Sequence, residues 1–223
     1  MSNTSNERAD KGSKFWIQEI ANNIVYRDQL DEMLRDNLKF FSPLEIESYK
    51  EYQLKEPKIF YEVLGLTKYE FNNKFSFWAN NQPHWDAIAI SATKKILYLF
   101  EAKAHLKELN SKISATDFLS IEKITSAMRN VHDKISVGAS NFESWRNKYY
   151  QLGNRLTFLY NLNQMHLPKI RETVLVLLNI IDDRTYIPTS RTDWIKNYEK
   201  VFMEMTGKKN PPDNVKLLYF AGR

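Results

Sequence analysis

The feature that most constrains the fold is a nearly unbroken apolar run late in the chain. Residues 171–181 read RETVLVLLNII, in which the run of Val, Leu and Ile is interrupted at Asn179. A short run of β-branched residues and Leu is typical of a strand buried on both faces, as in a sheet covered by helices on either side. It is far shorter than the roughly 20 residues that a transmembrane helix needs. The run therefore predicts a buried strand of an α/β domain.

Helical periodicity is found on both sides of this strand in the sequence. Apolar residues recur at helical spacing in residues 14–39, where we expect one long helix or two shorter ones. Ser42 and Pro43 are typical of a helix cap and of the first helical position, so a helix is expected from there to about Lys55. Further helices are expected within 57–72, broken at Gly65, and at 116–137, 142–164 and 193–206.

Aromatic and alternating segments predict the other strands, because such residues fit the pleated surface of a sheet. We expect strands at 74–80, 84–91, 96–104 and 214–222. The tetrapeptide ATKK joins the second and third of these, which makes them a β-hairpin. Residues 1–12 are polar and are expected to be a disordered tail. The prediction is thus a single α/β domain over residues 13–223, with a mixed sheet.

The composition excludes several classes of protein. Because the 223 residues contain no cysteine, there is no disulfide framework, thiolate metal site or cysteine nucleophile. The sequence holds no Walker loop, GxGxxG, HExxH or GxSxG motif, so nothing in it supports an NTPase, dinucleotide-binding, zincin or serine hydrolase function. The start of the chain lacks the apolar segment of a signal peptide, and we expect a soluble, cytoplasmic protein.

The charge of the chain is moderately basic and unevenly distributed. The net charge is +5 with a pI of about 9.1, and the basic excess begins at Lys94 and continues to the end. A basic surface attracts phosphate backbones. A charge of this size is also ordinary for a soluble protein, so charge alone leaves both interpretations open.

The predicted hairpin brings three charged residues together. If residues 93–94 form a two-residue loop, Asp86 faces Glu101 across the two strands. Side chains alternate along a strand, so Lys103 lies on the same face as Glu101. An apolar surface would then end in Asp86, Glu101 and Lys103. This expectation depends on the loop, since a slip of one residue would move one strand's side chains to the other face.

Asp86 and Glu101 would be facing carboxylates with Cβ atoms about 4.5–5.5 Å apart. They repel each other unless a proton, a cation or a divalent metal compensates them. Oxygen ligands favour Mg²⁺ or Mn²⁺ over Zn²⁺, and a neighbouring lysine can balance charge or assist an attacking water. Such a set is suited to phosphodiester hydrolysis. The alternative is a solvated strand end with an ion pair of little energetic value.

The pattern of Asp86, fourteen residues and then Glu101-Ala102-Lys103 resembles the PD-(D/E)xK nuclease superfamily, which includes restriction endonucleases and many repair nucleases. The resemblance extends to the element order α-β-β-β-α-β expected over residues 14–181. It departs from the motif before Asp86, because Pro83 is not adjacent to it. The resemblance implies a restriction endonuclease-like fold and a Mg²⁺-dependent deoxyribonuclease acting on DNA, with Mn²⁺ able to substitute.

The resemblance also assigns roles to residues of this chain. Asp86 and Glu101 would bind the metal, helped by the backbone carbonyl of Ala102, and Lys103 would be the catalytic lysine. Members of the superfamily often add an acidic residue from the first helix, for which Glu19 is the candidate. Three other acidic residues would serve equally: Glu45, Glu47 and Glu51.

Residues around the motif are candidates for binding DNA, although solvated surface positions are the alternative. These candidates are His84, His105, Lys107 and Lys123. Trp78 and Trp85 could stack on bases, but core packing is the commoner role. Many members of the superfamily act as homodimers, and residues 142–165 are the candidate interface. The alternative to a nuclease is a non-catalytic nucleic-acid-binding or interaction module on the same fold.

Overall fold

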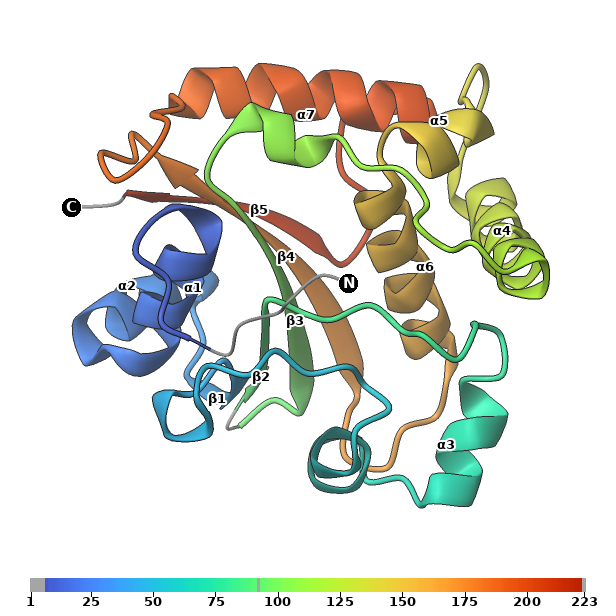
Figure 1. Ribbon diagram of the computed structural model, residues 1–223, viewed down its shortest axis with the longest axis horizontal. Helices are drawn as coiled ribbons and strands as arrows, with labels where there is room; N and C mark the ends of the chain where they lie inside the picture. Colours follow the sequence, from blue (N-terminus) through green and yellow to red (C-terminus); the bar gives the residue numbers. More distant parts are fainter. Residues whose placement is uncertain (1–6, 92, 222–223) are drawn as a thin grey trace.

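The fold is built around one five-stranded mixed sheet, which Figure 1 shows in the computed structural model. The structure describes residues 7–91 and 93–221. The strands follow the order β1 (Leu38–Ser42), β2 (Ala87–Ser91), β3 (Ile96–Lys103), β4 (Glu172–Ile181) and β5 (Val215–Ala221). β1, β2 and β3 are antiparallel neighbours, whereas β4 is parallel to β3 and β5 is parallel to β4. The predicted mixed α/β sheet is confirmed.

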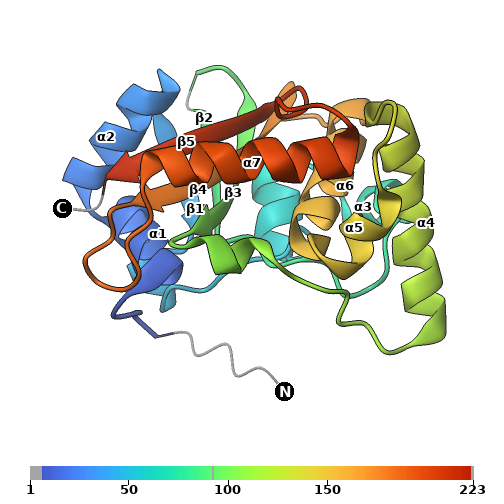
Figure 2. The ribbon, with the colours of Figure 1, turned by 90° about the horizontal axis from the view of Figure 1, so that it is seen from above.

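Helices cover both faces of this sheet. They are α1 (Gly12–Asn22), α2 (Ile24–Leu34), α3 (Lys68–Lys74), α4 (Phe118–Ile135), α5 (Phe142–Asn147), α6 (Tyr150–Gln164) and α7 (Arg191–Thr206). Figures 1 and 2 show α1 and α2 on one side of the sheet and α4 to α7 on the other. Leu97 and Leu99 of β3 belong to the core on the α4–α7 side, whereas Tyr98 and Phe100 belong to the core on the α1 side. The sheet therefore separates two apolar cores.

β4 is buried on both faces, as its apolar run predicts. Leu175 and Leu177 lie in the core beneath α6 and α7, while Val174, Val176 and Leu178 lie in the core beneath α1. The predictions of the hairpin strands, of the helices realised as α4 and α7, and of the last strand are confirmed within a few residues. Within 57–72 the chain forms a π-helix at Lys58–Leu64 and then α3, separated at Gly65.

The strand predicted at 74–80 is wrong. α3 ends at Lys74, and the residues after it form turns. Phe75 and Trp78 both pack towards Phe158, with ring centroids 6.4 and 5.1 Å apart. These aromatic side chains all enter one core, so they do not alternate between two faces as in a strand. The first strand is instead β1, whose first two residues fall at the end of the segment expected to be helical over 14–39.

The helix predicted from Ser42 to about Lys55 is also wrong. Over residues 43–55 the structure contains a 3₁₀ turn at Glu45–Glu47 and no α-helix. Ser42 is the last residue of β1, and its hydroxyl oxygen accepts a hydrogen bond from the Ile88 N–H at 3.2 Å. Its polar side chain therefore ties β1 to β2 and does not cap a helix.

The helix predicted at 142–164 is broken into α5 and α6. At the break, the Ser111 N–H donates to the carbonyl of Lys148 at 2.7 Å, and the Tyr150 N–H donates to the carbonyl of Ser111 at 3.1 Å. Backbone from a distant segment thus takes up hydrogen-bonding groups that a continuous helix would use itself. α6 is buried over most of its length, so its apolar side chains pack in the core of this chain and not on an exposed face.

The segment before α1 is held against that helix where it is described. The Ala9 N–H donates to Gln18 Oε1 at 2.7 Å, and Arg8 pairs with Glu19 at 2.7 Å. The first six residues of the predicted tail lie outside the described residues. In residues 7–91 and 93–221, no helix has both the length and the apolar character needed to cross a membrane.

Candidate functional site

Asp86, Glu101 and Lys103 meet where the β2–β3 hairpin reaches the carboxyl end of β3. The pairing of Ile88 with Leu99 is the register that a two-residue loop predicts. The last pair of the hairpin is Ala87 with Phe100. If the same register continues by one residue on each strand, Asp86 lies opposite Glu101. Asp86 Oδ2 accepts a hydrogen bond of 2.7 Å from the N–H of Ala102, the residue between Glu101 and Lys103.

Glu101 is the centre of a buried ion-pair network. The residue is 3% exposed. Its Oε1 accepts a hydrogen bond from Lys103 Nζ, and its Oε2 accepts one of 2.6 Å from Arg155 Nε. Lys103 also donates to Gln151 Oε1 at 2.9 Å. Because one carboxylate faces two cations, the network has a positive excess before Asp86 is considered.

Arg155 connects the network to the chain that leads into β2. Its Nη2 donates to the carbonyl of His84 at 2.7 Å, and its guanidinium lies 4.4 Å from the ring centroid of Trp85. Arg155 is not among the site residues predicted from the sequence. A signal was present, since a charged residue in the apolar stretch of a buried helix needs a partner. The sequence does not reveal that this partner is Glu101, because the two are distant along the chain.

The network separates the pKa values of its two carboxyl groups. Burial, with the charge of Glu101 next in importance, raises the pKa of Asp86 to about 8. Asp86 retains some exposed surface as a residue, but its carboxyl group is enclosed. Burial also opposes ionisation of Glu101, yet Arg155 and Lys103 outweigh it and hold the pKa of Glu101 below its usual value. Perturbed groups of this kind cluster at functional sites, although structural ion pairs also produce them.

Lys103 remains charged in this surrounding. Burial works against its charged form, but Glu101 and Asp86 raise the pKa of Lys103 above its usual value. The directions of these pKa shifts favour a charged Lys103 and a charged Glu101, and they make Asp86 the first of the two carboxyl groups to take up a proton as the pH falls.

Glu51 is the acidic residue that the structure brings to this network. Burial raises the pKa of Glu51, the charges of Lys14 and His84 lower it, and Glu101 raises it further. Lys14 comes from α1, which thus contributes a cation to this side of the site. Glu19 is placed elsewhere, paired with Arg8 in a separate polar cavity.

The other acidic candidates are also engaged outside the network. Glu47 accepts hydrogen bonds from Lys58 and, at 3.1 Å, from the hydroxyl of Tyr52. Glu45 lines the same cavity as Glu19. Among the four acidic residues considered from the sequence, Glu51 is therefore the one whose charge acts on Asp86 and Glu101.

The residues predicted to bind DNA occupy different places. His84 is exposed, with Nδ1 3.2 Å from the carbonyl oxygen of Glu51, at the edge of the network. His105 lies 3.1 Å from Glu108 through its Nε2. Lys107 is exposed in the 3₁₀ turn that follows β3. Lys123 is on α4 and lines a cavity beside α3.

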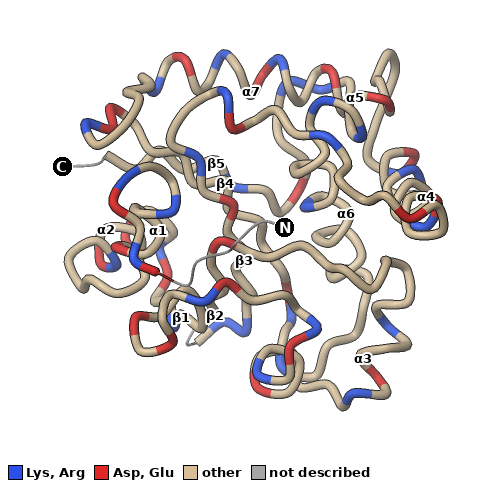
Figure 3. The backbone as a smooth tube through the Cα atoms, viewed as in Figure 1, with Lys and Arg blue, Asp and Glu red and all other residues tan. Residues whose placement is uncertain are grey.

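Trp78 and Trp85 are both buried, at 3% and 0% exposure. Packing is therefore the main role of both indole rings. The basic excess of the second half of the chain does not form a purely basic stripe along α4 or α7, since Figure 3 shows both signs of charge on these helices.

The oxygen donors of the site fit a hard cation such as Mg²⁺. Asp86 and Glu101 supply carboxyl oxygens, and Ala102, whose N–H donates to Asp86 Oδ2, directly follows Glu101 in β3. In the described part of the chain, no group of three or more His, Cys, Asp and Glu residues is arranged to hold a metal. Mg²⁺ does not require one, because it commonly uses one or two carboxylates and keeps several waters. A carboxylate has about four lone-pair sites, so Glu101 has capacity beyond its two hydrogen bonds.

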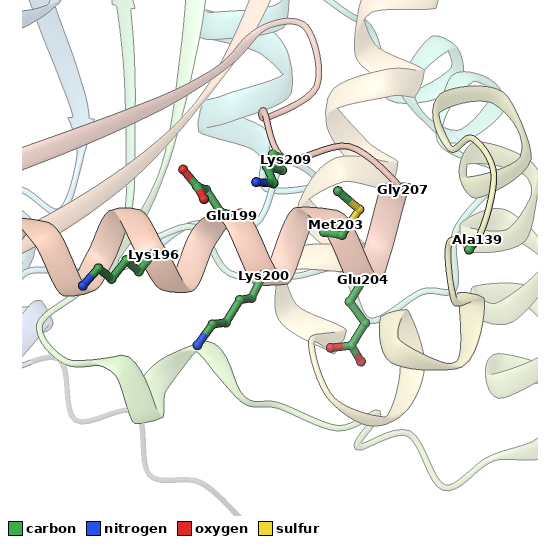
Figure 4. A pocket seen from close by; sticks show the side chains of 8 residues that line it. All are labelled: Ala139, Lys196, Glu199, Lys200, Met203, Glu204, Gly207 and Lys209. Atoms are coloured by element: carbon green, nitrogen blue, oxygen red, sulfur yellow. The ribbon is translucent and has the colours of Figure 1, made fainter.

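A cavity of about 750 Å³ lies over α7, and none of the residues that line it belongs to this network. Figure 4 shows its side chains, with Lys196, Lys200 and Glu204 projecting from the helix. Both signs of charge line it, and Glu204 is paired with Lys148 at 2.6 Å. We therefore centre the site on the buried network and not on this cavity.

Comparison of the chain with protein-family models, with curated proteins and with solved structures finds no match. The resemblance seen in the sequence thus stays a prediction.

Proposed function

We propose that the protein is a metal-dependent endonuclease that hydrolyses phosphodiester bonds of DNA, of the restriction or repair type. The observation that carries this proposal is the contact network of Asp86, Glu101 and Lys103 at the end of β3. The alternative of a solvated strand end is less consistent with it, because Glu101 and Lys103 are buried, at 3% and 8% exposure.

The topology supports the same proposal. α1 and α2 are followed by three antiparallel strands, with α3 inserted between β1 and β2, then by α4 to α6, and then by β4 parallel to β3. Apart from α3, this order is consistent with the order α-β-β-β-α-β that the PD-(D/E)xK resemblance implies, although its first strand is β1 and not the segment expected from the sequence. A restriction endonuclease-like fold belongs to the proposal.

The site residues take complementary roles in this reaction. Asp86, Glu101 and the carbonyl of Ala102 would hold Mg²⁺, which supplies positive charge for the phosphate. Lys103 sits beside Glu101, where its ammonium group stabilises the negative charge that grows on the phosphoryl oxygens. A water oxygen would form the new bond to phosphorus while the water loses a proton to solvent, the bond to the 3′ oxygen would break, and that oxygen would take up a proton from solvent. The products are a 5′-phosphate and a 3′-hydroxyl.

The test is cleavage of supercoiled plasmid and of single-stranded DNA with Mg²⁺ or Mn²⁺. Asp86→Asn is the sharpest variant, because it removes the carboxyl group that would bind the metal and keeps an acceptor for the Ala102 N–H. Lys103→Ala tests the lysine, and Lys216→Ala, at an exposed position of β5, is the matched control. We expect EDTA-sensitive products from the wild type and the control, with at least a hundredfold loss in both site variants.

Two other results would contradict the proposal. Cleavage that persists in Asp86→Asn would exclude Asp86 from the hydrolysis. Absence of cleavage, with salt-dependent DNA binding retained in all variants, would identify a non-catalytic binding module instead. Circular dichroism of each variant establishes that lost activity does not reflect lost folding.

A further inference from the structure

The single negative charge of Glu101 is shared between two cations. Its Oε2 accepts a hydrogen bond of 2.6 Å from Arg155 Nε, and its Oε1 accepts one from Lys103 Nζ. All three residues are buried, so water screens their charges little. Glu101 has lone pairs left for a further ligand, but its charge is already balanced. A metal ion bound to it would add positive charge beside both cations.

Arg155 is fixed beside Glu101 by contacts that do not involve Glu101. Its Nη2 donates to the carbonyl of His84 at 2.7 Å, and its Nη1 donates to Asn154 Oδ1 at 3.1 Å. The guanidinium also lies 4.4 Å from the ring centroid of Trp85, at the distance of a cation–π contact. These three contacts would keep the guanidinium in place even if its hydrogen bond to Glu101 were broken.

The two cations differ in how easily they can leave Glu101. Lys103 has a flexible stem and a second acceptor, Gln151 Oε1, at 2.9 Å, so its ammonium group can turn away and keep a partner. Arg155 has a rigid, planar head group that does not lose its proton in proteins. Arg155 is therefore the cation that a metal ion on Glu101 would meet as a fixed charge.

The consequence for a metal ion follows from distance and charge. Mg²⁺ lies about 2.0–2.1 Å from its oxygen ligands, so on Oε2 of Glu101 it would be a close neighbour of the guanidinium. Like charges at short range repel strongly in a buried site, where the effective dielectric constant is low. The guanidinium thus opposes the ion that the carboxylate attracts.

We propose that Arg155 competes with the divalent metal ion for Glu101 and keeps the metal affinity of the site low. The inference rests on the proposed function for the role of the metal, and it names the residue that sets the affinity for it. Arg155 is a positioning residue in this sense, since it acts on the metal through Glu101. If Arg155 only supported the shape of the site, its loss would weaken metal binding. Competition predicts the opposite sign.

The test measures Mn²⁺ binding to the full chain without DNA, from the free Mn²⁺ signal in electron paramagnetic resonance. Arg155→Met should bind Mn²⁺ at least about tenfold more tightly than the wild type, because one fixed positive charge is gone. Arg155→Lys keeps a charge and should stay within about threefold of the wild type. Arg146→Met is the matched control, because it removes a partly exposed arginine of α5.

A further variant locates the ion. Adding Asp86→Asn to Arg155→Met should abolish the gain in affinity, since it removes the second carboxyl group of the same site. Unchanged or weaker Mn²⁺ binding in folded Arg155→Met would overturn the inference, and so would a gain that survives Asp86→Asn.

A measurement on the wild type covers the case in which Arg155→Met does not fold. In protein labelled with ¹⁵N-arginine, the Nε–H signal of Arg155 is assigned by its loss in Arg155→Lys. Saturating Mg²⁺ should move this signal upfield, because the hydrogen bond to Glu101 weakens. A signal that stays in place would overturn the inference.

The outcomes separate this inference from the nuclease itself. Tighter Mn²⁺ binding in Arg155→Met, without DNA cleavage by the wild type, would support the inference and contradict the nuclease. DNA cleavage by the wild type, with equal Mn²⁺ binding in the wild type and Arg155→Met, would refute the inference and leave the nuclease. Absence of Mn²⁺ binding at millimolar concentration in both proteins would contradict both.

Discussion

Replacing Arg155 with methionine should destabilise the protein more than any comparable change of a surface arginine. Arg155 is 2% exposed and donates to Glu101 and to the carbonyl of His84. Methionine has a similar length and fills part of the same space without a charge. The substitution therefore removes these two charge-assisted hydrogen bonds and a third, to Asn154 Oδ1 at 3.1 Å, and it leaves Glu101 with Lys103 as its remaining cation.

The size of the effect follows from burial. Breaking a buried ion pair by removing one partner typically costs about 3–5 kcal/mol, because the other charge stays buried without full compensation. Lys103 still pairs with Glu101, so we expect about 3 kcal/mol, at the lower end of that range. Arg146→Met is the matched control, since its pair with Glu143 is 3.6 Å long and partly exposed. Such surface pairs contribute about 0–1 kcal/mol.

The assay is equilibrium unfolding in urea at pH 7, carried out as a double-mutant cycle with Glu101→Gln. In the Glu101→Gln background the Arg155→Met change should cost less, since no carboxylate is left unpaired there. The expected coupling is at least about 1.5 kcal/mol. A loss below about 1 kcal/mol for Arg155→Met, equal to that of Arg146→Met, would refute the view that Glu101 depends on Arg155.

Two further predictions concern stability away from the network. Burial opposes ionisation of Asp36, but hydrogen bonds, the strongest from the Tyr98 hydroxyl at 2.8 Å, hold its pKa below the usual value. The stabilisation by ionised Asp36 is thus complete above the unfolded-state pKa of about 3.9, and it is lost as the pH falls through the lower folded-state pKa. In urea unfolding from pH 2 to 6, the free energy of unfolding of Tyr98→Phe should therefore fall less at acid pH than that of the wild type. Gly207→Ala should lower the melting temperature clearly more than Gly138→Ala. Both glycines have a positive φ, but a Cβ at Gly207 would lie 1.9 Å from the carbonyl oxygen of Val137, whereas a Cβ at Gly138 would meet nothing within 4 Å. Equal melting temperatures of these two variants would contradict the clash.

The part of the site carried by one hairpin could be predicted from sequence. Two strands joined by a short loop have few registers, and the alternation of side chains then fixes which residues share a face. The observed pairing of Ile88 with Leu99 agrees with that reasoning. It brings Asp86, Glu101 and Lys103 into one network before any long-range contact is considered.

The remainder of the site depends on contacts that no local pattern contains. Arg155 and Glu51 come from α6 and from the loop after β1, and tertiary packing alone brings them to Glu101. The first strand was missed for a related reason. β1 is short and follows a helical pattern directly, whereas residues 74–80 have strand-like composition but pack around Phe158.

The parallel pairing of β3 with β4 also has a consequence for folding kinetics. Ile96 pairs with Glu172, and all of α4, α5 and α6 lies between these two residues in the chain. The ends of this long segment must meet before the central strands gain their contacts, and such non-local pairing slows folding. The hairpin of β2 and β3 can close within about 1–10 μs, long before β4 joins it. Asp86 is therefore expected to reach Glu101 early in folding, when the hairpin closes, while Arg155 reaches Glu101 with the final assembly of the sheet.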